Sequence, residues 1–241
     1  MMKNEKTLFV VLDIETTDKK RLAFDVAWTI TDKQGADYGS GSYLISEVLK
    51  IDQPYYKDKW SQYLLDLKDG KIAYATISEV IDTLNQQISD LKEKGHRVIL
   101  CAYNARFDLT WLPYTYLQIT GDKSTDKFDQ WTDLLDIWAF WGQSVPKQYV
   151  AELTNSGKYL STSAESAWRY EFQIADNQLP DFKEMHIGWH DVAIEKDILL
   201  RTLKRKKKMP IVQCKEQFAG AVWKKINERV NPATVSQMPL L

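Results

Sequence analysis

The chain has 241 residues, of which 44% are hydrophobic, and a formal net charge of −1 at pH 7. This is the composition of one globular domain with ample core material, and it excludes a protein that is basic throughout. Cys101 and Cys214 have neither the spacing of metal ligands nor the number that a disulfide framework needs. No apolar run approaches the roughly 20 residues of a membrane span, and no signal peptide is present, so we expect a soluble cytoplasmic protein without a membrane partner.

Three strands are expected near the start of the chain. Residues 8–14 are almost entirely apolar and predict a buried strand. Residues 22–31 alternate between apolar and polar side chains and lead through a turn at 32–35 into a return strand over 38–45. These three segments together predict an antiparallel meander. Residues 46–75 are polar and mixed, and we expect irregular or short helical structure there.

A helix followed by a strand comes next. Thr76 and Glu79 have the spacing of a capping box, an apolar stripe at helical period follows over 77–91, and Gly95 ends the helix. Residues 97–102 then read as an apolar, central strand. A helix that returns to a strand in this way implies a parallel crossover, so the sheet should be mixed.

Periodicity and capping signals predict further helices over 106–118, 130–142, about 163–174, 190–208 and about 215–229. The third of these opens with a capping box formed by Thr162 and Glu165. The fourth turns Ile194, Ile198 and Leu199 inward. The fold class is therefore α/β, with a mixed central sheet, made of an antiparallel meander plus parallel strands, flanked by helices.

Positive charge gathers late in the chain. Residues 201–230 contain ten Lys or Arg against two acids, a net of +8, so the other 211 residues carry −9. Lys204–Lys208 within this stretch fits a phosphate-contacting patch, a targeting signal or a solvated helix end, and the last is the commonest fate of a charge run. We expect one domain over 1–208, with 209–241 as a basic helix and tail appended to it.

The first candidate site is the pair Asp13 and Glu15 at the end of the first strand. Because strand side chains alternate, both carboxylates point to the same side. Two like charges beside a buried strand are costly unless a cation lies between them, so the pair predicts a divalent metal. The alternative is a strand end whose acids simply face water.

The second candidate is the segment Asn104–Asp108, which directly follows the strand that ends at Ala102. Asp108 should lie at the carboxyl end of a central strand or in the first turn of the next helix, where the sites of open α/β sheets gather. The alternative is a plain helix cap formed by Asn104 or Asp108.

The third candidate is the segment His186–Asp191. Asp191 opens the late helix and His186 precedes it in a loop, so an imidazole and a carboxylate can converge. A neutral histidine beside metal-held water is a natural general base near pH 7. The alternatives are a first-turn acid that complements the helix dipole and a surface histidine.

The order Asp-x-Glu, Asn-x-x-Phe-Asp and His-x-x-x-x-Asp resembles the DEDDh 3′–5′ exonucleases, the DnaQ-like branch of the ribonuclease-H-like superfamily. The resemblance spans about residues 7 to 203 and is nearest to phage and bacterial members. It implies a ribonuclease-H-like fold in which four carboxylates bind two Mg²⁺ or Mn²⁺ ions and His186 acts as the general base. The implied metal ligands are Asp13, Glu15, Asp108 and Asp191.

The resemblance also implies four substrate-binding residues, namely Thr16, Thr17, Asn104 and Phe107, although core packing explains Phe107 more simply. Asp136 matches a position where the family often has Asp, and we interpret it as a structural support. Trp189 departs from the small aliphatic residue usual two places before the last Asp. His190 is then a neighbour, exposed or in contact with substrate.

The implied activity is hydrolysis of single-stranded nucleic acid from its 3′ end, DNA rather than RNA, with release of nucleoside 5′-monophosphates. Four carboxylates suit hard cations, and the lack of a Cys/His cluster argues against zinc. A separate polymerase or replication chain is a conceivable partner. The alternative from another class is an adaptor of the same fold that binds nucleic acid or a polymerase without chemistry, motivated by the basic segment 201–230.

Overall fold

The computed structural model describes residues 5–122, 126–145, 163–172 and 185–213. Its sheet is formed by seven strands, β1 (Thr7–Thr16), β2 (Ala23–Asp32), β3 (Asp37–Ile45), β4 (Ala73–Ala75), β5 (Arg97–Ala102), β6 (Asp133–Asp136) and β7 (Val212–Gln213). The helices are α1 (Ser46–Ile51), α2 (Trp60–Lys68), α3 (Ile77–Glu93), α4 (Ala105–Thr120), α5 (Ile137–Gly142), α6 (Ala164–Phe172) and α7 (Gly188–Arg205), with short 3₁₀ turns at Lys57–Lys59 and Asp126–Phe128.

The sheet is mixed, in the order β4-β3-β2-β1-β5-β6-β7. β1 pairs antiparallel with β2, and β2 pairs antiparallel with β3. β1 pairs in parallel with β5, and β5 pairs in parallel with β6. In chain order α3 joins β4 to β5, and α4 lies between β5 and β6. β1 therefore lies at the centre, where the antiparallel meander meets the parallel strands, and it runs several residues beyond its last partner on β5.

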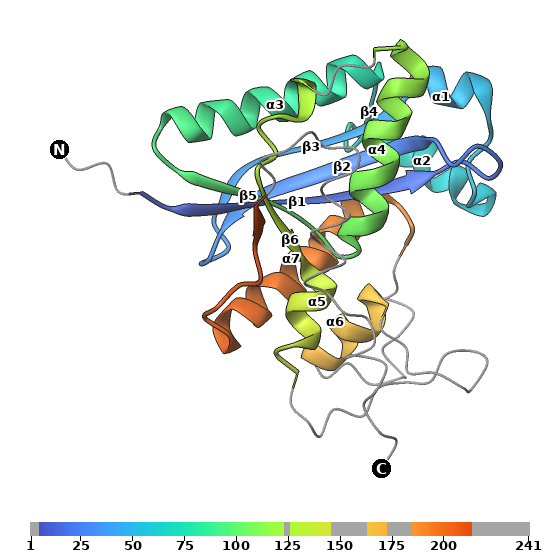
Figure 1. The fold of residues 1–241 in the computed structure, drawn as a ribbon. Coiled ribbons are helices and arrows are strands. Elements are labelled where there is room, and N and C mark those ends of the chain that lie inside the picture. The colour runs from blue at the N-terminus through green and yellow to red at the C-terminus, as the bar shows by residue number, and fades with distance from the viewer. Residues whose placement is uncertain (1–4, 123–125, 146–162, 173–184, 214–241) are drawn as a thin grey trace.

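Helices cover both faces of this sheet (Figure 1). α3 and α4 pack on one face against side chains such as Val10 and Leu12 of β1. α5, α6 and α7 pack on the other face against Phe9 and Val11, which alternate with the first pair along the same strand. An apolar strand buried on both faces explains why the first strand has an almost unbroken hydrophobic run.

Most of the predicted elements are confirmed. The meander, the helix after Thr76, the strand over 97–102, the helix over 106–118 and the late helix all occur within a few residues of their expected bounds. Thr76 and Glu79 form the complete capping box, and Ile194, Ile198 and Leu199 are buried. The mixed α/β class with flanking helices is likewise confirmed.

The helix expected over 130–142 is wrong in its first half. Residues 133–136 form β6, and only 137–142 are helical. Leu134 packs into the core on one face of the sheet and Leu135 into the core on the other, so an apolar run that looked helical is a short buried strand. The prediction for 46–75 also missed β4, which adds only three residues to the edge of the sheet beside β3.

The remaining predictions concern the ends of late elements. Thr162, and with it the second capping box, lies outside the described residues, where the helix predicted over 215–229 also falls. Among the described residues, the hydroxyl of Ser163 accepts a hydrogen bond from the N–H of Ser166 at 3.2 Å at the start of α6. No helix in the described ranges has the length and apolar character needed to cross a membrane.

The basic run Lys204–Lys208 is divided by the end of α7. Arg205 pairs with Glu171 of α6, and the Lys206 ammonium donates to the Gln143 carbonyl at 3.2 Å. These two side chains therefore fasten the end of α7 to neighbouring segments. Lys204, Lys207 and Lys208 are exposed, as expected if the basic run is a solvated helix end.

A candidate metal centre at the end of strand β1

Asp13 and Glu15 lie side by side on one face of β1, as their spacing predicted. Asp13 stands opposite Ala27 and Glu15 opposite Asp25 in the antiparallel pairing with β2. Both side chains are partly buried on the face that α7 covers. One carboxylate oxygen of Asp13, Oδ2, is buried and has no hydrogen-bond partner among the described residues. A buried carboxylate oxygen of this kind is able to accept a cation as its partner.

Asp108 reaches the same strand from the first turn of α4. Its Oδ1 accepts a hydrogen bond from the backbone N–H of Ile14 at 3.2 Å, between the two acids of β1. This N–H is free to do so because β1 pairs with β5 only as far as Val11. Asp108 is 3% exposed and its carboxylate accepts a hydrogen bond from strand β1, so it does more than cap the helix on which it lies.

Asp191 comes from the first turn of α7 and is fixed by the loop before it. Its two carboxylate oxygens accept the backbone N–H groups of Met185, at 3.2 Å, and Ile187, at 3.0 Å. The side chain is buried, with 2% of its surface exposed. Charge-assisted bonds of this kind hold a carboxylate in one orientation and so define the ligand geometry that it offers.

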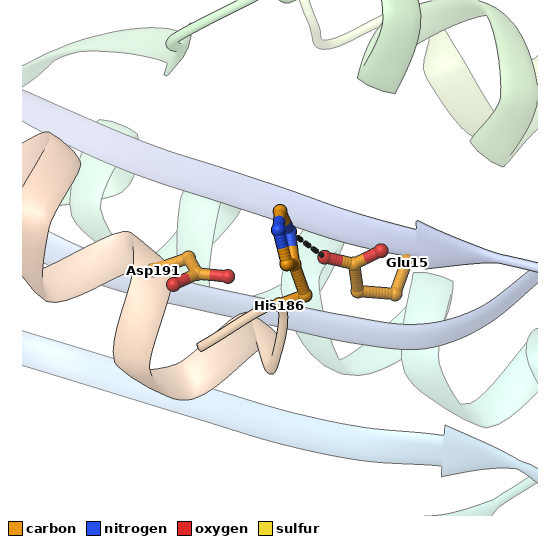
Figure 2. A group of neighbouring side chains, drawn as sticks. All are labelled: Glu15, His186 and Asp191. Atoms are coloured by element: carbon orange, nitrogen blue, oxygen red, sulfur yellow. Dashed lines mark ion pairs between the residues drawn. The ribbon is translucent and has the colours of Figure 1, made fainter. Parts of the chain in front are cut away.

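His186 completes the group from the loop that Asp191 holds. Figure 2 shows its imidazole between the carboxylates of Asp191 and Glu15. The Nδ1 atom lies 3.6 Å from Oε1 of Glu15. Glu15, His186 and Asp191 each offer one ligand atom within 4.8 Å of the others, a spacing that a single cation can bridge. Asp13 and Asp108 lie outside this trio and adjoin it through β1.

The charges of the cluster act on one another. Burial raises the pKa of Asp13 well above its ordinary value, and the negative charges of Glu195, Asp108 and Asp191 raise it further. Burial likewise raises the pKa of Asp108, although the N–H of Ile14 opposes the change. These shifts mean that the carboxylates repel one another in the metal-free protein, and a divalent cation would relieve that repulsion.

Glu195 is an acidic residue that the sequence interpretation did not assign to the site. It is 4% exposed on α7, and its Oε2 accepts the N–H of Tyr103 at 3.3 Å. Its charge is the largest electrostatic contribution to the raised pKa of Asp13. Glu195 follows Asp191 by four residues, which places both on one helix face, and this spacing could have identified it.

The four predicted substrate-binding residues differ in their surroundings. Thr17 is 1% exposed, and its hydroxyl accepts the N–H of Leu22 to close the turn after β1. Thr16 is also buried, and Phe107 packs against the core. Asn104 is exposed at the start of α4, and its side chain does not cap that helix, so its amide faces solvent.

Trp189 and His190 both make contacts within the fold, and those of Trp189 explain why a large side chain occupies position 189. The Trp189 indole N–H donates to Oδ2 of the buried Asp66 at 3.0 Å, and Lys71 lies 5.2 Å from the ring centroid. His190 is half-buried rather than exposed and its ring lies against Trp189, with the centroids 3.7 Å apart. The large indole therefore anchors the first turn of α7 to α2.

Asp136 links the starts of two helices beside the carboxylates. Its Oδ1 accepts the N–H of Ala139 at 2.8 Å and caps α5, while Oδ2 accepts the N–H of Ala105 at 3.2 Å at the start of α4. It therefore supports the helix that presents Asp108, in agreement with the structural role expected for it.

Asp136 should make stability fall with rising pH. Burial raises its pKa from 3.8 to about 7 against the opposing N–H bonds, so between these values the folded protein keeps a proton that the unfolded chain has lost. This contribution is full below about pH 4 and lost by about pH 7, a decrease of about 4 kcal/mol in the free energy of unfolding. Urea unfolding in EDTA across this range, compared with Asp136→Asn, measures it. If the free energy of unfolding falls with pH equally in both proteins, the prediction is contradicted. The test uses the dependence on pH and not the absolute stability, because Asn at this position loses one hydrogen bond at every pH.

Comparison with models of known protein families and with curated protein sequences found no match to this chain. Four acids and one histidine, contributed by β1, α4 and the loop and first turn of α7, form a group with oxygen ligands for hard divalent cations and an imidazole beside them.

Proposed function

We propose that this protein is a metal-dependent 3′–5′ exonuclease of the DEDDh type, built on a ribonuclease-H-like fold. The observation that carries the proposal is the convergence of Glu15, His186 and Asp191 within 4.8 Å. The hydrogen bond from the N–H of Ile14 to Asp108 adds a third segment to the same place. The meander β3-β2-β1, extended by the parallel strands β5 and β6, is the mixed sheet that such a fold requires.

The residues present fit a pair of Mg²⁺ or Mn²⁺ ions. The ligand oxygens would come from Asp13, Glu15, Asp108 and Asp191. Oδ2 of Asp13, which has no hydrogen-bond partner among the described residues, and the raised pKa values fit a site shaped for cations. Bound there, such ions would supply positive charge that stabilises the negative charge developing on a phosphodiester.

The side chains of the protein position the ligands, accept a proton and contact the substrate. Asp191 and Asp108, both held by backbone N–H groups, keep the ligand positions fixed. His186 accepts the proton of the attacking water, and Glu15 beside its Nδ1 orients the ring and favours the protonated form that results. Asn104, whose side chain is exposed at the start of α4, contacts the nucleotide in this proposal. The products are a nucleoside 5′-monophosphate and a strand shorter by one residue.

Digestion of matched single-stranded DNA and RNA oligonucleotides tests this proposal. With Mn²⁺ or Mg²⁺ the full chain should shorten a 5′-labelled strand one nucleotide at a time from its 3′ end, and a 3′-labelled strand should release its label as a mononucleotide. EDTA should stop both reactions. We expect DNA to be degraded faster than RNA. Intact DNA and RNA in the presence of both metals would overturn the proposal, and release of 3′-monophosphates would overturn its mechanism.

A further inference from the structure

The backbone of His186 adopts a conformation that needs support. Its φ of +52° lies in the left-handed region, and among the described residues only Arg21 shares this feature without being glycine. A non-glycine residue in this region is strained and persists only where its surroundings enforce the conformation. The loop carrying the imidazole is therefore held in place by other groups.

Asp25 of β2 and Tyr63 of α2 are the groups in contact with this loop. Both are 0% exposed. Oδ2 of Asp25 accepts two hydrogen bonds, one from the Tyr63 hydroxyl and one from the backbone N–H of Gly188, each at 2.8 Å. The same hydroxyl lies 3.3 Å from the carbonyl oxygen of His186. The two side chains thus contact the loop on both sides of Ile187.

The fit between Asp25 and Gly188 is close. A Cβ added to Gly188 would lie 3.1 Å from Oδ1 of Asp25 and 3.0 Å from Cβ of Ala27, so this position admits no side chain without displacement. Oδ1 of Asp25 has no hydrogen-bond partner among the described residues and faces this backbone. Asp25 is therefore placed to hold the start of α7 and not to add a ligand to the carboxylate group.

Stability alone does not account for a buried carboxylate such as that of Asp25. Replacement of buried ionic groups by apolar side chains of similar size is often neutral or stabilising, so we infer that Asp25 serves to fix one arrangement of the chain around it. Here the arrangement fixed is that of the histidine loop. The imidazole itself is stacked on Tyr56, with ring centroids 4.1 Å apart and planes 9° from parallel, which sets the ring while Asp25 and Tyr63 set the backbone.

We propose that Asp25 and Tyr63 are positioning residues that hold His186 in the orientation needed for proton transfer. This proposal rests on the proposed function, in which His186 accepts the proton of the attacking water. Neither residue touches the reacting atoms; both act through the backbone of residues 186–188. Their removal should therefore reduce kcat while leaving KM nearly unchanged, because substrate binding does not depend on the histidine.

A set of matched variants tests the proposal. Tyr63→Phe removes only the hydroxyl and should lower kcat about tenfold, and Asp25→Ala should lower it about 10²-fold, the cost of a small misplacement of a catalytic group. Asp25→Asn should retain most activity, because its single amide oxygen can still accept both bonds. Tyr116→Phe is the control, since it removes a Tyr–Asp hydrogen bond of 3.2 Å on α4.

A double-mutant cycle with His186→Ala separates positioning from general damage. If the two residues act only through the imidazole, Tyr63→Phe and Asp25→Ala should cause no further loss of kcat in the His186→Ala protein. Equal losses in both backgrounds, or an unchanged kcat in the wild-type background, would overturn the proposal.

Histidine NMR provides a readout that does not require activity. The chain has only three histidines, so ¹⁵N-labelled imidazoles give three sets of signals. Tyr63→Phe should broaden or multiply the His186 signals and leave those of His96 unchanged, and Tyr116→Phe should alter neither. Unchanged His186 signals in both Tyr63→Phe and Asp25→Ala would refute the positioning role. Failure of the oligonucleotide digestion with a perturbed His186 would instead refute the proposed function alone.

Discussion

Replacing Asp13 with asparagine should abolish hydrolysis and, in the same protein, stabilise the metal-free fold. Burial raises the pKa of the Asp13 carboxyl, and the charges of Glu195, Asp108, Asp191 and Glu15 raise it further. Its Oδ2 has no hydrogen-bond partner among the described residues. Removing the charge relieves both the burial cost and the repulsion, so the free energy of unfolding in the absence of metal should increase at neutral pH. The same change removes one of the proposed metal ligands, and we expect kcat to fall about 10³-fold or more.

Two measurements check the Asp13→Asn prediction. Urea unfolding in EDTA gives the stability of the metal-free protein, and release of mononucleotides in Mn²⁺ gives the rate. Asp58→Asn is the matched control, because it removes the same charge from a side chain that is 73% exposed. It should change neither quantity appreciably. An Asp13→Asn protein that keeps its activity, or that loses activity and stability together, would contradict the assignment of Asp13 as a ligand.

Manganese should raise the melting temperature of the protein, and more so at pH 8 than at pH 5.5. An ion that binds the folded state alone stabilises it by about 2.7 kcal/mol at a concentration one hundred times its Kd. Protons compete with the ion because the pKa values of Asp13 and Asp108 are raised, so the competition weakens as the pH rises. Stabilisation by manganese should therefore grow with pH, although the metal-free protein loses stability in the same direction.

Calorimetry with Mn²⁺ and with EDTA at the two pH values measures this effect. Glu15→Gln should lose most of the manganese shift, since Glu15 belongs to the trio within 4.8 Å. Asp37→Asn, a change at an exposed residue of β3, should keep it. A shift that is absent in the wild-type chain, or that survives in Glu15→Gln, would show that the carboxylate group is not the metal centre.

The sequence predicts the parts of this fold whose patterns extend over many residues. The meander and α3 have clear periods and caps, and Thr76 with Glu79 marks the start of α3 as predicted. β6 could not be distinguished from a helix, because four residues buried on both faces carry no period. β4 is shorter still, and its pairing with β3 depends on tertiary contacts that local pattern does not encode.

In the candidate site, too, some residues are predictable from local pattern and others depend on tertiary contacts. Asp13, Glu15, Asp108, His186 and Asp191 were identified from motif order, and the fold gathers them around the end of β1. Asp25 and Tyr63 have no such motif, because an acid in a strand and a tyrosine in a helix are ordinary until the fold joins them to Gly188. Glu195 has a recognisable signal, its position one helical turn after Asp191, but it does not belong to the motif His-x-x-x-x-Asp.

The carboxylates of this group come from segments far apart in the chain, and the last of them arrives on α7. A nascent polypeptide that has emerged only through α6 can contain the meander and the parallel strands β5 and β6, yet it lacks the final acid and the imidazole. Such a polypeptide would hold only part of the carboxylate group. Any chemistry that needs the whole group would therefore begin only after α7 has been synthesised and has packed on the sheet.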